Sequence, residues 1–205
     1  MAWHQAYEDP ASRLSVRLRV VQEQLRRALD ERPGRVRIVS MCAGEGRDVI
    51  AVLADHDRRA DVTARLVELD ARNVEVARQA VNSAGLDNVE VVCADAALTD
   101  SYTGAVPADV VMACGVFGNI SEDDIKRTIE HLPELCAAGA TVIWTRYGGP
   151  ERDVAQDVRR WLDERGFEEI AFEASDEHVY RVGVHRLMAA PRSLSRAMRL
   201  FTFVR

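Results

Sequence analysis

The stretch 36–48, VRIVSMCAGEGRD, is an apolar, β-branched run followed by a turn that contains two glycines. The run is typical of a buried strand in a parallel sheet. After the turn, Val49, Ile50, Val52 and Leu53 have the spacing of one face of a helix. A strand, a glycine turn and a helix in this order predict the start of a βαβ unit, where the backbone of the turn can approach a ligand closely.

The rest of the chain continues this alternation of strand and helix. Further strands are expected at 64–69, 89–93, 109–113 and 141–145, with helices between them, and an amphipathic helix is expected over about 11–31. Beyond the helix that Gly166 ends, we expect 168–172 to pair antiparallel with the final run RLFTFVR. The pattern predicts an α/β fold, a doubly wound and mostly parallel seven-stranded sheet with an antiparallel edge strand and helices on both faces.

The length and composition fit one folded domain. With 205 residues, 22.8 kDa, 47% hydrophobic and 29% charged residues, the chain is expected to form a single domain over 1–205. We divide it into an N-terminal lid and helix at 1–31, a ligand-binding core at 35–173, and a C-terminal extension with the edge strand at 174–205.

Charge and cysteine patterns narrow the class of protein. The net charge of −6 disfavours nucleic acid as a partner, because phosphate contacts dominate such binding. No run approaches the roughly 18 apolar residues of a membrane span, and the first residues lack a signal-peptide pattern, so we expect a cytoplasmic protein with no membrane partner. The four cysteines lack a CxxC pair, which indicates reduced thiols and no metal site.

Acidic residues follow the second and third expected strands, at the edge where doubly wound sheets bind ligands. Glu68 and Asp70 stand roughly two dozen residues after the glycines, where a carboxylate can accept both hydroxyls of a ribose. Either can instead cap the helix that begins near Arg72, and this role fits Asp70 better. Asp95 and the backbone N–H of Ala96 offer the acceptor and the donor that an adenine edge requires.

Four segments in this order, VSMCAGEGRD, VELD, CADA and ADVVMACGVFGNIS, resemble motifs I to IV of the class I S-adenosylmethionine (SAM) dependent methyltransferases. The resemblance covers about residues 35–173 and implies SAM as the cofactor. The residues it implies for cofactor binding are Ala43, Gly44 and Gly46 under the methionine part, Glu68 at the ribose, Leu69, Asp95 and Ala96 at the adenine, and Cys114 beside the sulfonium.

Two positions of the first motif depart from the family pattern. Ser40 stands where an acid is usual, and Cys42 stands in place of the first glycine. The usual acid helps to hold the ammonium group of the methionine part, so Asp48, Glu45 or backbone carbonyls would take over that role here. A degenerate copy of the fold that binds no cofactor is the alternative, and the retained glycines and both later acids argue against it.

The expected acceptor-side residues are Tyr7, Asn119 and His185 as catalytic candidates, with Arg146 and Tyr147 as further lining. Tyr7 belongs to an aromatic segment, 3–7, that is expected to close over the cofactor. His185 lies in 178–199, which reads as a long connection between the two edge strands, and long ordered connections are often functional. Ordinary packing or surface exposure is the alternative role for each of these side chains.

We therefore predict a SAM-dependent methyltransferase that acts on an oxygen or a nitrogen of a small metabolite, as a monomer or a homodimer. After the fourth strand the chain reads CGVFGN, without the Asn/Asp-Pro-Pro-aromatic run common in nucleic-acid and protein N-methyltransferases of the family. That departure and the net charge of −6 favour a small acceptor. The alternatives are an RNA methyltransferase that uses the C-terminal arginines, and a non-catalytic protein that binds an adenosyl ligand.

Overall fold

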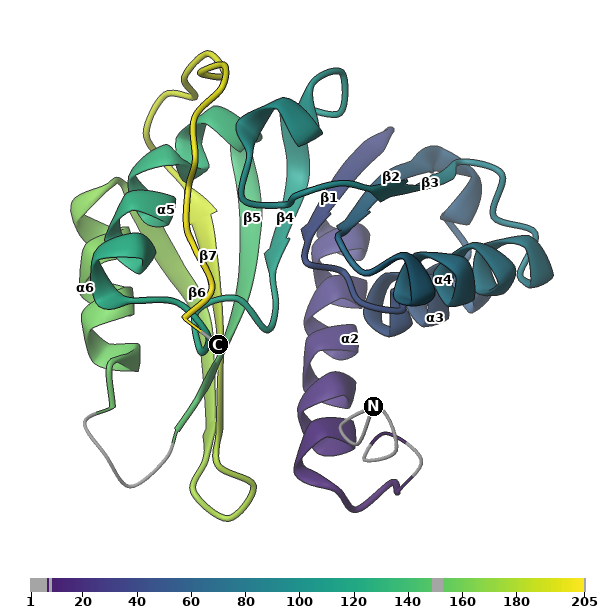
Figure 1. Cartoon of the computed structure of the whole chain (residues 1–205), viewed down its shortest axis with the longest axis horizontal. Helices are drawn as coiled ribbons and strands as arrows, with labels where there is room; N and C mark the ends of the chain where they lie inside the picture. The colour runs from purple at the N-terminus through teal and green to yellow at the C-terminus, as the bar shows by residue number, and fades with distance from the viewer. Residues whose placement is uncertain (1–6, 8, 149–152, 205) are drawn as a thin grey trace.

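Seven strands form one sheet in the order β3-β2-β1-β4-β5-β7-β6 (Figure 1). The structure is a computed structural model, and it describes residues 7, 9–148 and 153–204. The strands are β1 (Val36–Met41), β2 (Val62–Glu68), β3 (Val89–Cys93), β4 (Ala108–Ala113), β5 (Cys136–Tyr147), β6 (Phe167–Ser175) and β7 (Tyr180–Leu187). β1 to β5 pair parallel, and β7 pairs antiparallel with both β5 and β6. The predicted fold class, a doubly wound and mostly parallel seven-stranded sheet, is confirmed, and its antiparallel pairing lies at the β6 end.

Helices cover both faces of the sheet (Figure 1). The helices are α2 (Arg13–Glu31), α3 (Arg47–Asp55), α4 (Ala71–Ser83), α5 (Glu122–Leu135) and α6 (Ala155–Glu164). One apolar core joins α2, α3 and α4 to the sheet, and a second joins α5 and α6 to its other face. The strand order reverses between β1 and β4, so the carboxyl ends of these two strands flank the switch point at which such sheets bind ligands.

α2 has the amphipathic pattern that the sequence predicted for 11–31. It begins after Ser12, whose hydroxyl oxygen accepts the backbone N–H of Ser15 at 3.1 Å and so satisfies one donor of the first turn. Leu25 and Leu29 are fully buried under the sheet. Each such side chain stabilises the fold by about 1.5–3 kcal/mol, so the packing of α2 is set by its second half.

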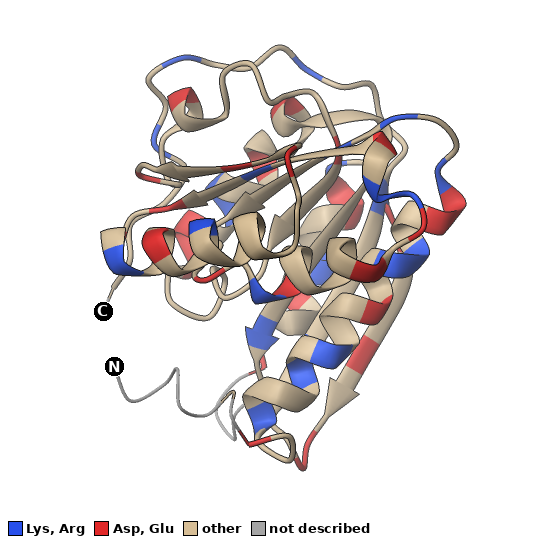
Figure 2. Cartoon of the chain, turned by 90° about the vertical axis from the view of Figure 1, so that its right-hand side faces the viewer, with Lys and Arg blue, Asp and Glu red and all other residues tan. Residues whose placement is uncertain are grey.

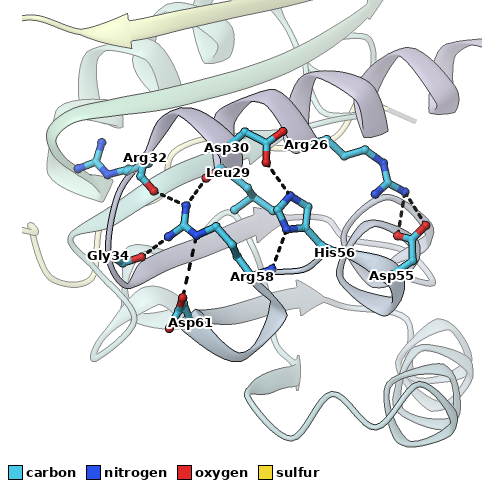
Figure 3. Close-up of polar contacts among 9 residues, drawn as sticks. All are labelled: Arg26, Leu29, Asp30, Arg32, Gly34, Asp55, His56, Arg58 and Asp61. Carbon is cyan, nitrogen blue, oxygen red and sulfur yellow. Dashed lines mark hydrogen bonds and ion pairs between the residues drawn. The ribbon is translucent and has the colours of Figure 1, made fainter.

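The carboxyl end of α2 is held by side chains from the loop between α3 and β2 (Figure 3). The guanidinium of Arg58 donates to the backbone carbonyls of Leu29, Arg32 and Gly34. Beside it, His56 Nε2 lies 3.4 Å from Asp30 of the same helix. These contacts satisfy carbonyls that a helix end leaves without partners, and they fix α2 relative to the sheet.

The last strand lies earlier in the chain than we predicted. β6 and β7 form a hairpin, so residues 180–187 are a strand inside the sheet, and the long connection expected at 178–199 is wrong. β7 lies between β5 and β6, which buries both of its faces and removes the usual polar alternation. Its arginines obscure the strand further, because Arg181 reaches Asp153 at 2.7 Å and Arg186 reaches Glu31 at 2.7 Å.

Residues 199–204, the described part of the final run RLFTFVR, form no strand of the sheet, which corrects the predicted pairing. Residues 188–204, which we call the C-terminal tail, instead pass over α5, as the yellow trace in Figure 1 shows. The Leu200 N–H donates to the Ala97 carbonyl at 2.8 Å, and the Thr202 N–H donates to Asp124 Oδ2 at 2.9 Å. Phe201 is buried at 1% exposure. Within residues 7, 9–148 and 153–204, no helix has the length and apolar character needed to cross a membrane.

Candidate functional site

A cavity of about 650 Å³ lies at the carboxyl ends of β1 to β4, at the switch point of the sheet. The loops after these strands line it on one side, and Tyr7 with the first half of α2 lines it on another. Its size is within the range of small-molecule sites. It brings together nearly all the predicted cofactor residues, namely Ala43, Gly44, Glu68, Leu69, Asp95, Ala96 and Cys114.

Glu68 is the last residue of β2 and is held by two backbone amides. The Gly44 N–H donates to its Oε2 at 2.8 Å, and the Asp70 N–H donates to its Oε1 at 2.9 Å. The residue is 9% exposed and faces the cavity. Asp70 is instead the cap of α4, because its side chain accepts the Arg72 N–H at 2.9 Å. The two neighbouring carboxylates therefore divide the ligand-facing and capping roles between them.

The glycine turn after β1 supplies part of the cavity floor through Ala43 and Gly44. Gly46, which the resemblance implies under the methionine part, is not among the residues that line the cavity. It has φ +69°, and a Cβ there would come within 2.8 Å of Ile50 and 2.9 Å of Leu66. Gly46 is therefore needed to start α3 and to pack that helix on β2. Cys42 also adopts a left-handed conformation, with φ +51°, although it is not glycine.

Asp95 follows β3 and has both of its carboxylate oxygens in use. The Ala97 N–H donates to Oδ1 at 2.9 Å, and Arg199 of the C-terminal tail reaches Oδ2 at 2.9 Å. Asp95 and Ala96 still line the cavity, and each carboxylate oxygen retains a further lone pair. The tail thus helps to orient the side chain that we expect at the adenine.

Two cysteines line the cavity, Cys42 after β1 and Cys114 after β4. Burial raises the pKa of Cys42 to about 12, and the nearby carboxylates of Glu68 and Asp95 raise it further in the same direction. Burial likewise raises the pKa of Cys114. Both thiols are therefore neutral near pH 7, so neither is an activated nucleophile. The part of the chain that the structure describes contains no group of three or more His, Cys, Asp or Glu arranged to hold a metal ion.

The predicted acceptor-side residues are only partly brought together. Tyr7 lines the cavity, with the guanidinium of Arg47 5.2 Å from its ring centroid. Asn119 lines it too, and its Nδ2 donates to the Gly115 carbonyl at 2.7 Å. The rest of the aromatic segment, 3–6, lies outside the described residues.

His185 lies away from the cavity, so the structure does not bring it to the acceptor side where it was predicted. It is 1% exposed within β7, where its Nδ1 accepts the Trp144 Nε1–H at 3.2 Å. Arg146 does not line the cavity either, because its guanidinium turns to the Phe117 carbonyl. Tyr147 is half exposed, and the guanidinium of Arg13 lies 5.4 Å from its ring centroid.

Several cavity residues were not predicted from the sequence. Those on α2 are Arg13, Leu14, Arg17, Leu18 and Val21, and the C-terminal tail adds Phe203. The leucines and the valine belong to the apolar face of the amphipathic helix expected over about 11–31, and helical spacing alone does not separate a turn that faces the sheet from one that faces a cavity. The two arginines beside that stripe were the available signal. Asp48 and Glu45, which the sequence offered as replacements for the usual acid of the first motif, both line the cavity, and burial raises the pKa of the Asp48 carboxyl group.

Comparison with known proteins agrees with the methyltransferase resemblance of the four segments that follow the strands. The family model for a methyltransferase domain matches residues 38–139, about half of the chain. Magnesium protoporphyrin IX methyltransferase from Synechocystis PCC 6803, whose structure holds bound SAM, is similar with TM-score 0.70 and 15% identity, over 90% of this chain and 88% of that one. Precorrin-6y C5,15-methyltransferase from Geobacter metallireducens GS-15 has TM-score 0.60 and 12% identity, over 84% and 87%. This chain belongs to the class I SAM-dependent methyltransferases.

Part of the sequence also matches proteins that are named as aldolases. The 5-keto-4-deoxy-D-glucarate aldolase of Salmonella arizonae (strain ATCC BAA-731 / CDC346-86 / RSK2980) is 30% identical over 116 residues, which are 57% of this chain and 42% of the aldolase. The chain thus spans less than half the length of the curated relatives it matches. Because most of the aldolase lies outside this match, the match does not establish an aldolase activity for this chain.

Proposed function

We propose that this chain uses SAM to methylate an oxygen or a nitrogen of a small metabolite. One observation carries the proposal: Glu68 is fixed by two backbone amides in the same cavity as Asp95 and the glycine turn. When it is bound, SAM supplies a methyl group on a positively charged sulfur. The residues of this chain would bind and orient that cofactor and its acceptor and exclude water from them.

The lining residues match the parts of SAM. Glu68 Oε2 accepts only the Gly44 N–H and keeps a lone pair for a ribose hydroxyl, whereas Oε1 accepts the Asp70 N–H and lies 3.5 Å from the Asn73 amide nitrogen. Asp95 can accept from the adenine amine, and the Ala96 N–H can donate to a ring nitrogen. Leu69 is 66% exposed although it is apolar, and it offers the adenine ring an apolar contact. Gly44 has no side chain that would keep the methionine part away from the backbone.

Methyl transfer from a sulfonium is an in-line displacement, so orientation and water exclusion are the main contributions of the protein. A general base is needed only when the acceptor atom carries a proton of high pKa. Tyr7 and Asn119 line the cavity, and we propose that they contact the acceptor. The relatives include a protein named as a carbon methyltransferase, so oxygen or nitrogen as the acceptor atom is the finer part of the proposal.

Internal pairing of four C-terminal arginines, which are all those in the described part of the chain except Arg196, supports a small acceptor over RNA. Arg181, Arg186 and Arg199 are each within 3 Å of a carboxylate of the same chain. Arg192 lies 3.4 Å from Glu134. On the side that Figure 2 shows, basic and acidic residues are interspersed along the helices, whereas a phosphate backbone is bound by a continuous basic face. We therefore propose that the chain has no nucleic-acid partner. We also propose that it has no membrane partner and that it acts as a monomer or a homodimer.

Transfer of label from methyl-labelled SAM tests this function. Three reactions would each contain the protein and labelled SAM. The first would also contain a low-mass metabolite extract, the second total RNA and the third total protein. We expect label to enter the low-mass fraction alone. Label in RNA would support the RNA methyltransferase instead, and SAM binding without any transfer would support a non-catalytic binding protein.

A further inference from the structure

Two arginines of α2 point to a ligand group that nothing above assigns. Arg13 and Arg17 lie one helical turn apart, and both line the cavity. Among the described residues, neither donates a hydrogen bond or joins an ion pair, and Arg13 has only its contact with the Tyr147 ring. Both side chains therefore line the cavity, and neither has an ion-pair partner within the part of the chain that the structure describes.

Other arginines of the same helix behave differently. Arg19 donates to the Pro10 carbonyl at 2.8 Å, Arg26 reaches Asp55 at 2.9 Å and Arg27 reaches Glu23 at 3.0 Å. Arg47, which lines the cavity from α3, is already paired with Glu45 at 2.6 Å. Lack of a partner is thus a feature of the two α2 side chains that line the cavity.

Helix stability does not explain this pair. Like charges four residues apart repel one another on a helix surface. Arg13 also lies in the first turn of α2, where the helix dipole disfavours positive charge, and that turn contains no acidic residue to offset it. A position that costs stability and faces a cavity is better explained by a bound partner.

Arg17 of this pair also acts on groups at the start of α3 and at the end of β4. Arg17 acts electrostatically on Asp48 and on Cys114, and it favours the ionised form of each. No ion pair joins Arg17 to Asp48 within 4.0 Å in the described chain, so the guanidinium is not neutralised there. Guanidinium groups bind carboxylates and phosphates through two parallel N–H bonds, which are stronger than neutral hydrogen bonds.

We propose that Arg13 and Arg17 form an anion site in the cavity wall that binds a carboxylate or phosphate group of a bound small molecule. Two ligands of this cavity can supply that chemistry, the amino-acid carboxylate of the cofactor and an acidic group on the acceptor. The inference rests on the proposed function to this extent, because both are ligands of the proposed reaction. The experiment has one arm for each source.

The first arm compares two nucleosides by calorimetry. S-adenosylhomocysteine carries the amino-acid carboxylate, and 5′-methylthioadenosine lacks it. The proteins are wild type, Arg13→Gln, Arg17→Gln and the double variant, with Arg35→Gln as control, because Arg35 is exposed at the start of β1 and also lacks a partner among the described residues. If the cofactor is the source, S-adenosylhomocysteine binds at least about tenfold more weakly to the double variant and 5′-methylthioadenosine binds equally to all five proteins.

The second arm uses protein saturated with S-adenosylhomocysteine. Inorganic phosphate is added, with chloride at equal ionic strength as reference, and the melting temperature is followed. If the acceptor is the source, phosphate raises the melting temperature of wild type and Arg35→Gln but not of the double variant. Circular dichroism checks that every variant is folded.

The proposal is overturned if the double variant matches wild type in both arms. Failure of the proposed function has a different signature, since wild type would then bind neither nucleoside. In that case phosphate is titrated onto the ligand-free protein, and the same comparison of double variant with wild type and Arg35→Gln decides whether the anion site exists.

Discussion

At the scale of single residues, Cys42 has a backbone conformation that favours glycine. Its φ of +51° is left-handed, and for a residue with a Cβ this costs about 1–2 kcal/mol. The cysteine at the first glycine position of the motif therefore keeps the turn but strains it. Its side chain also lines the cavity, so a substitution of Cys42 can change stability both by removing the sulfur and by relieving the backbone strain.

Two substitutions separate these effects. Cys42→Ala removes the sulfur and keeps the strain, whereas Cys42→Gly removes both. We expect the glycine variant to be more stable than the alanine variant by about 1 kcal/mol in urea denaturation, because glycine adopts positive φ freely. Equal stability, or a more stable alanine variant, would contradict a strained turn.

His185 is the second residue whose environment makes a prediction. Burial lowers its pKa to about 4 from the ordinary value of 6.5, although Glu169 opposes the shift. Between these values the unfolded chain binds more protons than the folded one, so stability falls as the pH drops from 6.5 towards 4. The loss for this group reaches about 3 kcal/mol when the titration is complete.

The variant His185→Gln tests this pH dependence. Glutamine does not titrate, and it retains an acceptor for the Trp144 N–H. Free energies of unfolding measured at about pH 7.5 and about pH 5 should show a smaller loss in the variant than in wild type. An equal loss in both proteins would mean that His185 is not held neutral by burial.

At the scale of elements, the C-terminal tail connects the second core to the cavity. Phe201 is 1% exposed and packs in the core beside α5, whereas Phe203, two residues later, is 43% exposed and lines the cavity. The isolated bridges of Leu98 with Arg199 and of Ile120 with Phe203 hold the tail along its course. One short segment therefore serves both packing and the site.

The two phenylalanines form a matched pair for testing that division. Phe201→Ala should lower the free energy of unfolding by about 3–5 kcal/mol, as expected for a large buried side chain. Phe203→Ala should lower it by less than about 1 kcal/mol and should change ligand affinity at the cavity. Denaturation and calorimetry on both variants check this, and a large loss of stability from Phe203→Ala would place that ring in the core.

Elements with strong periodicity could be predicted from the sequence, and the rest could not. The glycine turn, the five parallel strands and α2 follow from apolar runs and helical spacing, which depend on local residues. β7 was missed because it is buried on both faces and carries Arg181 and Arg186, whose partners come from distant segments. Glycine is required at position 183 of β7, because a Cβ there would lie 2.2 Å from the indole of Trp144 in β5. No local pattern encodes such contacts.

At the scale of the whole molecule, the topology explains which candidate residues meet. Residues directly after parallel strands converge on the switch point, so Glu68, Asp95 and Cys114 line one cavity as expected. Tyr7 and Asn119 also reach it. His185 does not, because its assignment relied on a connection that is really a strand. The sequence therefore predicts a site well where topology determines it, and poorly where a helix face or a terminal tail completes it.

The most direct test of the whole account is the affinity for S-adenosylhomocysteine measured by calorimetry. The variants are Glu68→Gln and, as a matched control, Asp70→Asn, which keeps a side chain able to cap α4. We predict that wild type binds, that Glu68→Gln loses about 1.5–3 kcal/mol of binding free energy, and that Asp70→Asn stays within about twofold of wild type. Wild type that does not bind, or Glu68→Gln that binds as tightly as wild type, would contradict the account.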